Sequence, residues 1–370
     1  MTTGARRHIK YLLKTVTVIA DLILICFFVA SAWGGVVNPN NSAYGAVIAL
    51  GFPIFLGLML LALIALLIWF RRLALVSVIA LIACISPILT YCPLNFFRPS
   101  EKTIEKEKGK TLRLLTFNIL DLYVYNGDVP ERGNPTMAFI LDSDADVVML
   151  QEAADILTPG FQGVDSVQRS RLLEMYPYHD LTRRGMAFFS KYPFESVDVD
   201  YEDHAQLDLC GYDVYFDGRK IRMFNVHMQS IGLTAEDKKV YVHITEGEAA
   251  NETAAIRSGL ISKLTAAFRS RADQAEDIRR VVRGVEGDVI LAGDFNDIPG
   301  SYAYRTVADA GLTDAYRQAG LGPAITYHAD RFYFRIDQIF YRGALEALRT
   351  WRGDCRTSDH YPLLCVFELK

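Results

Sequence analysis

Three long apolar runs fill the first hundred residues of the chain. Gly45 to Phe70 and Leu73 to Phe97 contain no charged residue, and Val16 to Trp33 is interrupted by a single acid, Asp21. At about 1.5 Å per residue, each run is long enough to cross the apolar interior of a bilayer. A cleaved signal peptide accounts for one short run after a basic start and leaves the other two unexplained. The pattern therefore predicts three transmembrane helices.

Basic residues flank these runs unevenly. Four precede the first run and two follow the second, whereas the turn from Gly34 to Tyr44 has none. The positive-inside rule then places the N-terminus in the cytoplasm, and three crossings place everything after Arg98 on the other side. Placing the charged side chain of Asp21 at the centre of a transmembrane helix costs roughly 2.5–3.5 kcal/mol, unless the residue lies near the interface or faces a neighbouring helix. A transport role is the alternative for Asp21, but we expect the membrane unit to be an anchor.

The pattern changes after the third apolar run. Residues 101–110 are charged, mixed in sign and without apolar periodicity, which predicts a short exposed linker. Beyond it, short runs rich in β-branched and aromatic residues alternate with turns. The expected strands are Leu112–Ile119, Asp146–Leu150, Met186–Phe189, Tyr212–Phe216, Lys220–Val226, Val289–Ala292, Phe332–Phe340 and Pro362–Leu369. Helices are expected over Thr136–Leu141 and Glu252–Arg283, and Asp217-Gly218 predicts a tight hairpin. So many strands with few βαβ intervals predict a layered α/β domain with mixed or antiparallel sheets.

Composition and charge separate the two parts of the chain. Of 370 residues, 51% are hydrophobic and 22% are charged, which excludes a disordered or collagen-like protein. The first hundred residues carry seven basic residues and one acid, whereas the rest carries 32 basic and 42 acidic residues, a net charge of −10. This acidic balance argues against tight, non-specific binding of a polyanion. Six cysteines are too few for a disulfide scaffold, and whether Cys355 and Cys365 form a bridge stays open.

Polar side chains suited to metal or acid–base chemistry lie at the ends of several expected strands. The apolar runs lead directly into these residues, or follow them: Asn118, Glu152, His227, Asp294, Asn296, Asp337, Asp359 and His360. Taken singly, each has an ordinary explanation, such as a turn amide or an acid at a helix start. Their recurrence, in this order, at the ends of six apolar segments favours one shared site.

The ordered set of segments resembles the endonuclease/exonuclease/phosphatase family. The resemblance covers Thr111 to Lys370 and lies in Thr116–Ile119, Leu150–Glu152, Gly185–Pro193, Asn225–Met228, Gly293–Asn296, Arg335–Phe340 and Ser358–His360, with Arg271 and Gln274 on a helix. It implies a four-layer α/β sandwich, in which helices flank two facing β-sheets, preceded here by the three transmembrane helices. The expected domains are a membrane anchor (1–100), the charged linker (101–110) and a catalytic domain (111–370).

The resemblance implies hydrolysis of a phosphoester by direct attack of water, with Mg²⁺ as the cofactor and Mn²⁺ as a possible substitute. Asn118 and Glu152 would then be the principal metal ligands, with Asp359 close to the metal. Oxygen ligands of this kind, few in number, suit a hard cation that keeps several of its waters.

The same resemblance assigns roles in catalysis to five residues. Asp294 would polarise the attacking water or protonate the leaving group, while Asn296 and His227 would contact phosphate oxygens. His360 would contact the phosphoryl group, and Asp337 would fix its tautomer and support its positive form. Whether Asp294 or His360 accepts the proton stays open.

The sequence leaves the substrate open among nucleic acids, phospholipids and inositol phosphates, because loops rather than the fold select it. The alternative function is a catalytically silent membrane module that binds a phospholipid or a protein partner. No obligate protein partner is inferred. The expected location is an inner or plasma membrane, with the lipid bilayer around the three helices and the catalytic domain outside the cytoplasm.

Overall fold

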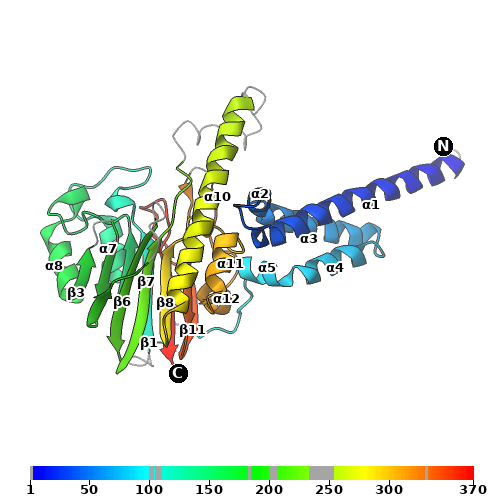
Figure 1. Cartoon of the computed structure of the whole chain (residues 1–370). Coiled ribbons are helices and arrows are strands. Elements are labelled where there is room, and N and C mark those ends of the chain that lie inside the picture. Colours follow the sequence, from blue (N-terminus) through cyan, green and yellow to red (C-terminus); the bar gives the residue numbers. More distant parts are fainter. Residues whose placement is uncertain are drawn as a thin grey trace. The chain divides into compact units, whose positions relative to one another are not determined.

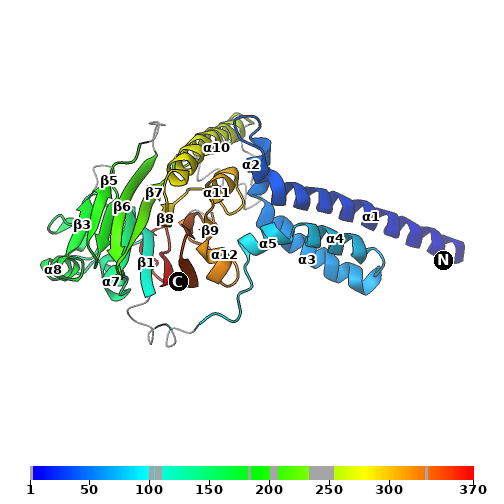
Figure 2. The ribbon, with the colours of Figure 1, turned by 60° about the horizontal axis from the view of Figure 1, so that its bottom comes forward.

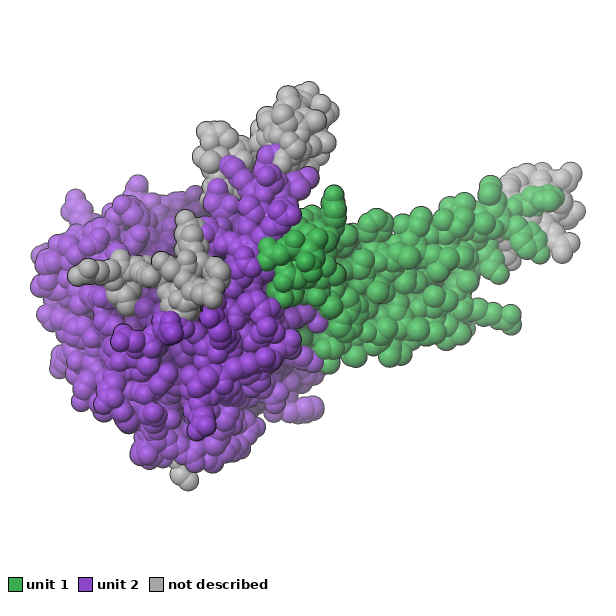
Figure 3. All heavy atoms as spheres, in the orientation of Figure 1, with its two compact units in different colours: residues 1–90, 300–302 green, residues 91–299, 303–370 purple. Residues whose placement is uncertain are grey.

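The structure is a computed structural model, and it describes residues 3–99, 104, 111–181, 185–200, 207–232, 254–329 and 332–370. The chain divides into two units, one of residues 1–90 with 300–302, the other of residues 91–299 with 303–370 (Figure 3). The predicted linker at 101–110 lies outside the described residues, apart from Ile104.

The first unit is helical. Its elements are α1 (Thr3–Trp33), the short helix η1 (Gly34–Val36), α2 (Tyr44–Ala49), α3 (Phe52–Trp69), α4 (Ala74–Ala83) and α5 (Ile85–Tyr91). Two segments, Tyr11–Val36 and Phe52–Trp69, are long and apolar enough to cross a membrane. Helices α4 and α5 are long and apolar enough to cross a membrane only if they are counted as one segment, and a bend of 66° separates them. The described residues therefore carry two candidate spans, or three if the bent pair is one span.

Pro87 gives the bend between α4 and α5 a physical cause. Proline has no N–H to donate to the carbonyl four residues earlier, here that of Ala83, and its ring also crowds that carbonyl. The last helix of the unit therefore restarts after Cys84 instead of continuing straight. An apolar pattern by itself contains no information about such a break, which is why the sequence predicted an unbroken third span.

The second unit contains two six-stranded mixed sheets. The strand order in the first is β11-β12-β1-β2-β4-β3, and in the second it is β5-β6-β7-β8-β10-β9. In each sheet one central pair is parallel, β1 with β2 and β7 with β8, and its flanking pairs are antiparallel. The strands are β1 (Thr111–Asn118), β2 (Val147–Gln151), β3 (Tyr178–Leu181), β4 (Ala187–Ser190), β5 (Phe194–Val197), β6 (Asp208–Phe216), β7 (Arg219–His227), β8 (Asp288–Asp294), β9 (Thr313–Asp314), β10 (Asp337–Arg342), β11 (Leu345–Arg352) and β12 (Leu363–Leu369).

Helices cover the outer faces of the two sheets and complete four layers (Figures 1 and 2). Side chains of α7 (Pro135–Asp142) and α8 (Ser166–Met175) pack on the first sheet, and those of α10 (Ala254–Arg283) and α11 (Tyr302–Ala308) pack on the second. A third apolar cluster fills the space between the sheets and includes α12 (Ala315–Ala319). The short helices η2 (Leu120–Leu122) and η3 (Phe161–Gly163) lie in loops. The predicted four-layer α/β sandwich is confirmed.

Most predicted elements are present with small shifts of their ends. Phe216 pairs with Arg219 across a two-residue turn whose central residues both have positive φ, as the hairpin prediction requires. Phe332–Phe340 is a strand only from Asp337 onward, because Phe334 pairs with Tyr327 instead. Cys355 and Cys365 are free thiols.

The chain just after α5 is held by the second unit. Pro93 is buried, and its carbonyl accepts a hydrogen bond from the N–H of Gly322 at 2.7 Å. The side-chain amide of Asn95 donates to the carbonyls of Arg317 at 3.0 Å and Gly320 at 2.9 Å. These contacts make residues 93–95 part of the folded unit.

We expect a soluble fragment that starts at Tyr91 to be more stable than one that starts at Thr111. Each of the three hydrogen bonds contributes about 0.5–1.5 kcal/mol net, part of which is offset by ordering the segment, so the difference should be about 1–3 kcal/mol. Thermal unfolding of the two fragments measures it. Asn95→Ala in the longer fragment should remove part of the gain, and equal unfolding temperatures for the two fragments would contradict the expectation.

Candidate active site

The site forms where the apolar core between the two sheets ends. Along five strands, alternate residues face this core, and the same alternation brings a polar side chain to the same side at one end of each strand. The core residue and the polar residue of each strand are Leu114 and Asn118 in β1, Met149 and Gln151 in β2, Met223 and His227 in β7, Ile290 and Asp294 in β8, and Ile339 and Asp337 in β10. The pleat of the strands thus gathers residues that are up to 219 positions apart in the sequence.

Asp294 lies at the centre of this group and is 1% exposed. Its Oδ2 lies 3.7 Å from Nε2 of His227 and 3.6 Å from Nε2 of His360, and it accepts a hydrogen bond from Nδ2 of Asn118 at 3.2 Å. Burial raises the pKa of Asp294, and the charges of the two histidines oppose that rise. Nitrogen atoms of His227, His360 and Asn118, from three other segments of the chain, therefore surround one carboxylate oxygen.

His360 is held by a second buried carboxylate. Nδ1 of His360 donates to Oδ2 of Asp337 at 2.9 Å, which directs Nε2 toward Asp294. Burial by itself lowers the pKa of His360, but the charges of Asp337 and Asp294 outweigh burial and raise this pKa to about 10. The backbone N–H groups of Ile336 and Asp337 both donate to Oγ1 of Thr326, which fixes the start of β10.

Glu152 reaches the site through a backbone turn. It follows β2, where strand alternation would direct its side chain to the outer face of the sheet, but its φ of 48° is left-handed. Such a conformation costs about 1–3 kcal/mol in a non-glycine residue and persists only when neighbours impose it. Here the carbonyl of Glu152 accepts from the N–H of Asp121 at 2.8 Å, and the N–H of Ala153 donates to the carbonyl of Gly185 at 2.7 Å.

The redirected carboxylate of Glu152 contacts the rest of the site. Its Oε1 accepts from Nδ2 of Asn118 at 2.9 Å and lies 3.9 Å from Nε2 of His227. Burial raises the pKa of Glu152, and the charges of Asp294 and Asp359 add to that rise. The structure therefore brings Asn118, Glu152, His227, Asp294, Asp337 and His360 together, with Asp359 near enough for its charge to act on Glu152 and His360.

The two asparagines contact other protein groups in the structure. Asn118 donates from Nδ2 to both Glu152 and Asp294, and its Oδ1 accepts from the N–H of Leu120 at 3.2 Å. Nδ2 of Asn296 donates to the carbonyl of Met228 at 2.9 Å and to Asp294 at 3.3 Å. In this arrangement both amides orient Asp294.

Two sets of donors, with no residue in common, could hold a divalent cation. The predicted set is Asn118, Glu152 and Asp359, of which Asn118 would offer its oxygen after a 180° turn of the amide. A second set, Asp294, Asp337 and His360, has one potential ligand atom from each residue within 4.8 Å of the others. Oδ1 of Asp337 is buried and has no hydrogen-bond partner among the described residues, and a cation or a donor would satisfy such an atom. Oxygen atoms predominate in both sets, as Mg²⁺ and Mn²⁺ prefer.

Two amide side chains join the sheets beside the site. Nε2 of Gln151 in the first sheet donates to Oδ1 of Asn225 in the second at 2.6 Å, and Nδ2 of Asn225 donates back to the carbonyl of Leu150 at 3.0 Å. Both residues are buried. They occur in the matching sequence segments, but no pattern along the chain predicts a contact between them.

Further contacts brace the loops that carry the site. Arg271 donates to Asp297 at 3.2 Å and to the carbonyl of Gln229 at 3.0 Å, so that α10 holds the loops after β7 and β8 together. Ser358 donates to the carbonyl of Asn118 at 2.7 Å and so ties the loop of His360 to the end of β1.

Sequence reasoning missed Tyr327 and Thr326. The ring of Tyr327 lies edge-on to that of His360, with 5.0 Å between the ring centroids, and Thr326 holds the start of β10. Both residues are in an irregular loop without apolar periodicity, so no pattern in the sequence pointed to them.

The geometry by itself defines a class of protein. Acidic, amide and imidazole groups converge at one end of a two-sheet sandwich, an arrangement suited to charged phosphoryl oxygens and an attacking water. The family model described as "Endonuclease/Exonuclease/phosphatase family" matches residues 115–360. The chain belongs to the endonuclease/exonuclease/phosphatase family, and it is a hydrolase that acts on phosphoester bonds.

Other comparisons place the chain among solved structures of low sequence identity. An endonuclease/exonuclease/phosphatase from Beutenbergia cavernae is 21% identical, with 70% of this chain and 72% of that chain covered and a TM-score of 0.47. A humanized D. rerio TDP2 with 14 mutations is 17% identical, with coverages of 70% and 99% and a TM-score of 0.46. The catalytic domain of human Nocturnin with a bound sulfate anion is 17% identical, with coverages of 70% and 95% and a TM-score of 0.46.

The other two findings concern the N-terminal region and the curated proteins. Residues 13–91 match a model for a domain of unknown function. No curated protein matches the chain significantly.

Proposed function

We propose that this chain is a membrane-anchored, Mg²⁺-dependent phosphoesterase that hydrolyses a phosphodiester or a phosphomonoester by direct attack of water. One observation carries the proposal: Oδ2 of Asp294 lies within 4 Å of His227, His360 and Asn118, and Glu152 lies against the same asparagine. This cluster combines a proton acceptor, donors for phosphoryl oxygens and an oxygen-rich place for a cation.

Asp294 and the residues around it have different roles in the reaction. Asp294 accepts the proton of the attacking water, because the nitrogen atoms of His227, His360 and Asn118 that converge on its Oδ2 favour the ionised form, which can take up a proton. His360 and His227 donate from Nε2 to phosphoryl oxygens, with Asp337 holding the ring of His360. Asn296 contacts a phosphate oxygen once its amide leaves the carbonyl of Met228.

A bound Mg²⁺ would neutralise charge that develops on the phosphoryl group and the leaving oxygen. Glu152 and Asn118 would hold it, with Asp359 nearby. The donor set fits this cation because Mg²⁺ keeps several waters and needs only one or two protein carboxylates. Mn²⁺, which accepts the same oxygen ligands, would substitute for it.

The test uses the full-length protein in a mild detergent. Bis(p-nitrophenyl) phosphate reports phosphodiesterase activity, and a panel of DNA, RNA, inositol phosphates and sphingomyelin covers the nuclease and headgroup-hydrolase specificities. We expect turnover of at least one of these substrates with Mg²⁺. Tight binding of a panel member without turnover of any would instead favour the catalytically silent module.

The location is part of the proposal. The candidate spans and the basic residues before and between them support an integral membrane protein with a cytoplasmic N-terminus. With three spans the catalytic unit is extracytoplasmic, and with two it is cytoplasmic. We propose three.

A periplasmic-active alkaline phosphatase fused after Pro99 should therefore be active in a bacterial host, because three spans carry the fusion point across the membrane. A β-galactosidase fusion at the same point is the matched control and should be silent. The reverse pattern would show that α4 and α5 together do not cross.

A further inference from the structure

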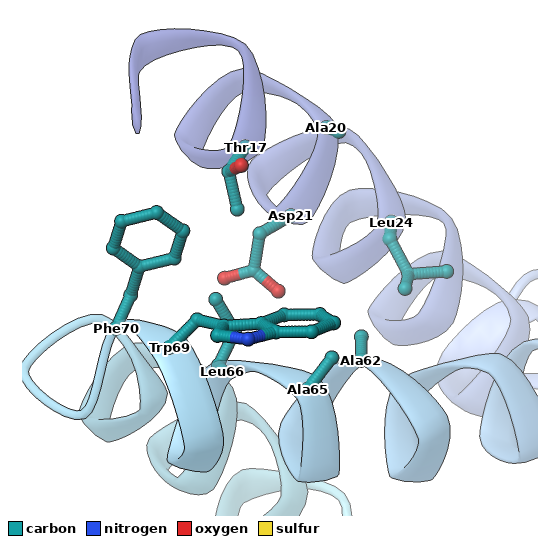
Figure 4. A pocket seen from close by; sticks show the side chains of 9 residues that line it. All are labelled: Thr17, Ala20, Asp21, Leu24, Ala62, Ala65, Leu66, Trp69 and Phe70. Carbon is teal, nitrogen blue, oxygen red and sulfur yellow. The ribbon is translucent and has the colours of Figure 1, made fainter. Parts of the chain in front are cut away.

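The first unit contains a cavity with a carboxylate in its wall. It has a volume of about 270 Å³ and lies between α1 and α3 (Figure 4). The nine lining residues are Thr17, Ala20, Asp21, Leu24, Ala62, Ala65, Leu66, Trp69 and Phe70. None of them is basic.

The sequence builds this cavity from two matching helix faces. The lining positions of α1 are separated by three, four and seven residues, and the same spacing recurs in α3 from Ala62 to Trp69. Residues with this spacing share one face of a helix, so the two faces oppose each other. Ala20, Ala62 and Ala65 occupy positions where larger side chains would fill the gap, and the space therefore remains open.

Asp21 is the charged group of the cavity. Its side chain is 8% exposed, and the hydroxyl of Ser77 in α4 lies 3.1 and 3.2 Å from its two oxygens. One hydroxyl supplies one hydrogen, whereas a carboxylate has about four acceptor sites. A charge held this way in an apolar bundle is costly unless a cation pairs with it. Lys14 lies on the same face of α1 two turns earlier, but it is exposed, and no ion pair joins it to Asp21 among the described residues.

Aromatic rings complete the wall beside the carboxylate. Figure 4 shows the indole of Trp69 below the carboxylate of Asp21 and the ring of Phe70 to one side. The face of an aromatic ring, above all that of tryptophan, attracts ammonium groups, and quaternary ammonium ligands are commonly bound in this way. Thr17 already donates its hydroxyl hydrogen to the carbonyl of Leu13 at 2.9 Å, so toward the cavity its oxygen can act as an acceptor.

We propose that this cavity binds the ammonium head of a cationic or zwitterionic amphiphile. A carboxylate, an acceptor hydroxyl and an indole face suit the head, and the alanine and leucine side chains suit the first methylene groups of a chain. A volume of about 270 Å³ is slightly below the usual range of small-molecule sites, which fits a head group rather than a whole lipid. Trp69 and Phe70 immediately precede Arg71 and Arg72, so this end of the cavity lies at the level where aromatic and basic residues meet lipid head groups. The proposal is independent of the phosphoesterase activity of the second unit.

The experiment measures ligand binding to the full-length protein in a neutral maltoside detergent. Trp33→Phe and Trp351→Phe leave Trp69 as the single fluorescent indole, since the chain has three tryptophans. Decyltrimethylammonium is the probe, and decanol and decanoate have the same chain with neutral and anionic heads. We expect a saturable change in Trp69 emission with the ammonium probe and at least tenfold weaker binding of the other two. Equal binding of decanol would overturn the proposal.

Variants test which residues form the site. Asp21→Asn keeps the shape and can still bond to Ser77, and it should weaken binding of the ammonium probe at least tenfold. Ala65→Leu fills the cavity and should do the same, whereas Ala83→Leu, at an exposed position of α4, should leave binding unchanged. Undiminished binding by both Asp21→Asn and Ala65→Leu contradicts the proposal. If tetramethylammonium binds as tightly as the ten-carbon probe, the ligand is a small soluble ammonium ion, and the proposed amphiphile is wrong.

Discussion

Asp294→Asn is expected to lower kcat/KM for phosphoester hydrolysis at least a thousandfold while the protein stays folded. Asparagine has nearly the same shape, and its oxygen can still accept the hydrogen bond from the N–H of Asn296 that Asp294 accepts at 2.8 Å. It cannot take up a proton from water, and it presents no charge to His227 and His360. A thousandfold loss corresponds to about 4 kcal/mol of transition-state stabilisation, within the range of general base catalysis.

The matched control is Asp142→Asn in α7. Asp142 is exposed and pairs with Arg171 at 3.3 Å, so the substitution removes the same atoms and charge from a position where they contribute at most about 1 kcal/mol. Its activity should stay within twofold of the wild type, and both variants should keep the wild-type far-UV circular dichroism. If Asp294→Asn retains more than a tenth of the activity, Asp294 is not the proton acceptor.

The residues of the candidate site could be predicted from the sequence because strand alternation extends to the strand ends. Met223 and His227 in β7, or Ile290 and Asp294 in β8, share a face, and the recurrence of a polar residue at the end of several such rows points to one shared site. Glu152 breaks this rule. Its approach to the site depends on a left-handed φ, which hydrogen bonds from Asp121 and between Ala153 and Gly185 impose.

What the sequence missed depends on contacts between distant segments. β11 escaped notice because a bulge between Ala347 and Arg349 breaks the alternation of inward and outward residues. The expected strand at Phe332 starts late because Phe334 pairs with Tyr327, and Arg335 next to it is buried in an ion pair with Asp314 at 2.8 Å. No local pattern reveals either contact. The bend of the third apolar run follows from Pro87. The run was identified by its lack of charged residues, and that criterion does not detect a proline.

Removing divalent metal is expected to abolish hydrolysis by the wild type. The same removal is expected to have a much smaller effect on Glu152→Gln, because this variant has already lost most of its activity. Chelation should lower the turnover of the wild type at least a thousandfold, and added Mg²⁺ or Mn²⁺ should restore it. Glu152→Gln keeps an oxygen but loses the charge that holds the cation. It should need at least ten times more Mg²⁺ for half-maximal activity and reach a maximum at least a hundredfold lower. The control, Glu195→Gln, changes an exposed acid of β5 and should behave like the wild type.

Thermal unfolding separates a metal ligand from a residue that only supports the fold. Without metal, the carboxylate of Glu152 is repelled by Asp294 and Asp359, and burial and this repulsion together raise its pKa. Glu152→Gln removes that charge, so the metal-free variant should unfold at a higher temperature than the metal-free wild type. With Mg²⁺ at 100 times the wild-type dissociation constant, the wild type should gain about 2.7 kcal/mol, and the variant, which binds at least tenfold more weakly, should gain at most about 1.4 kcal/mol. A residue that merely supported the fold would lower the unfolding temperature in both conditions. A variant destabilised without metal, with an unchanged gain on adding it, would therefore remove Glu152 from the metal site.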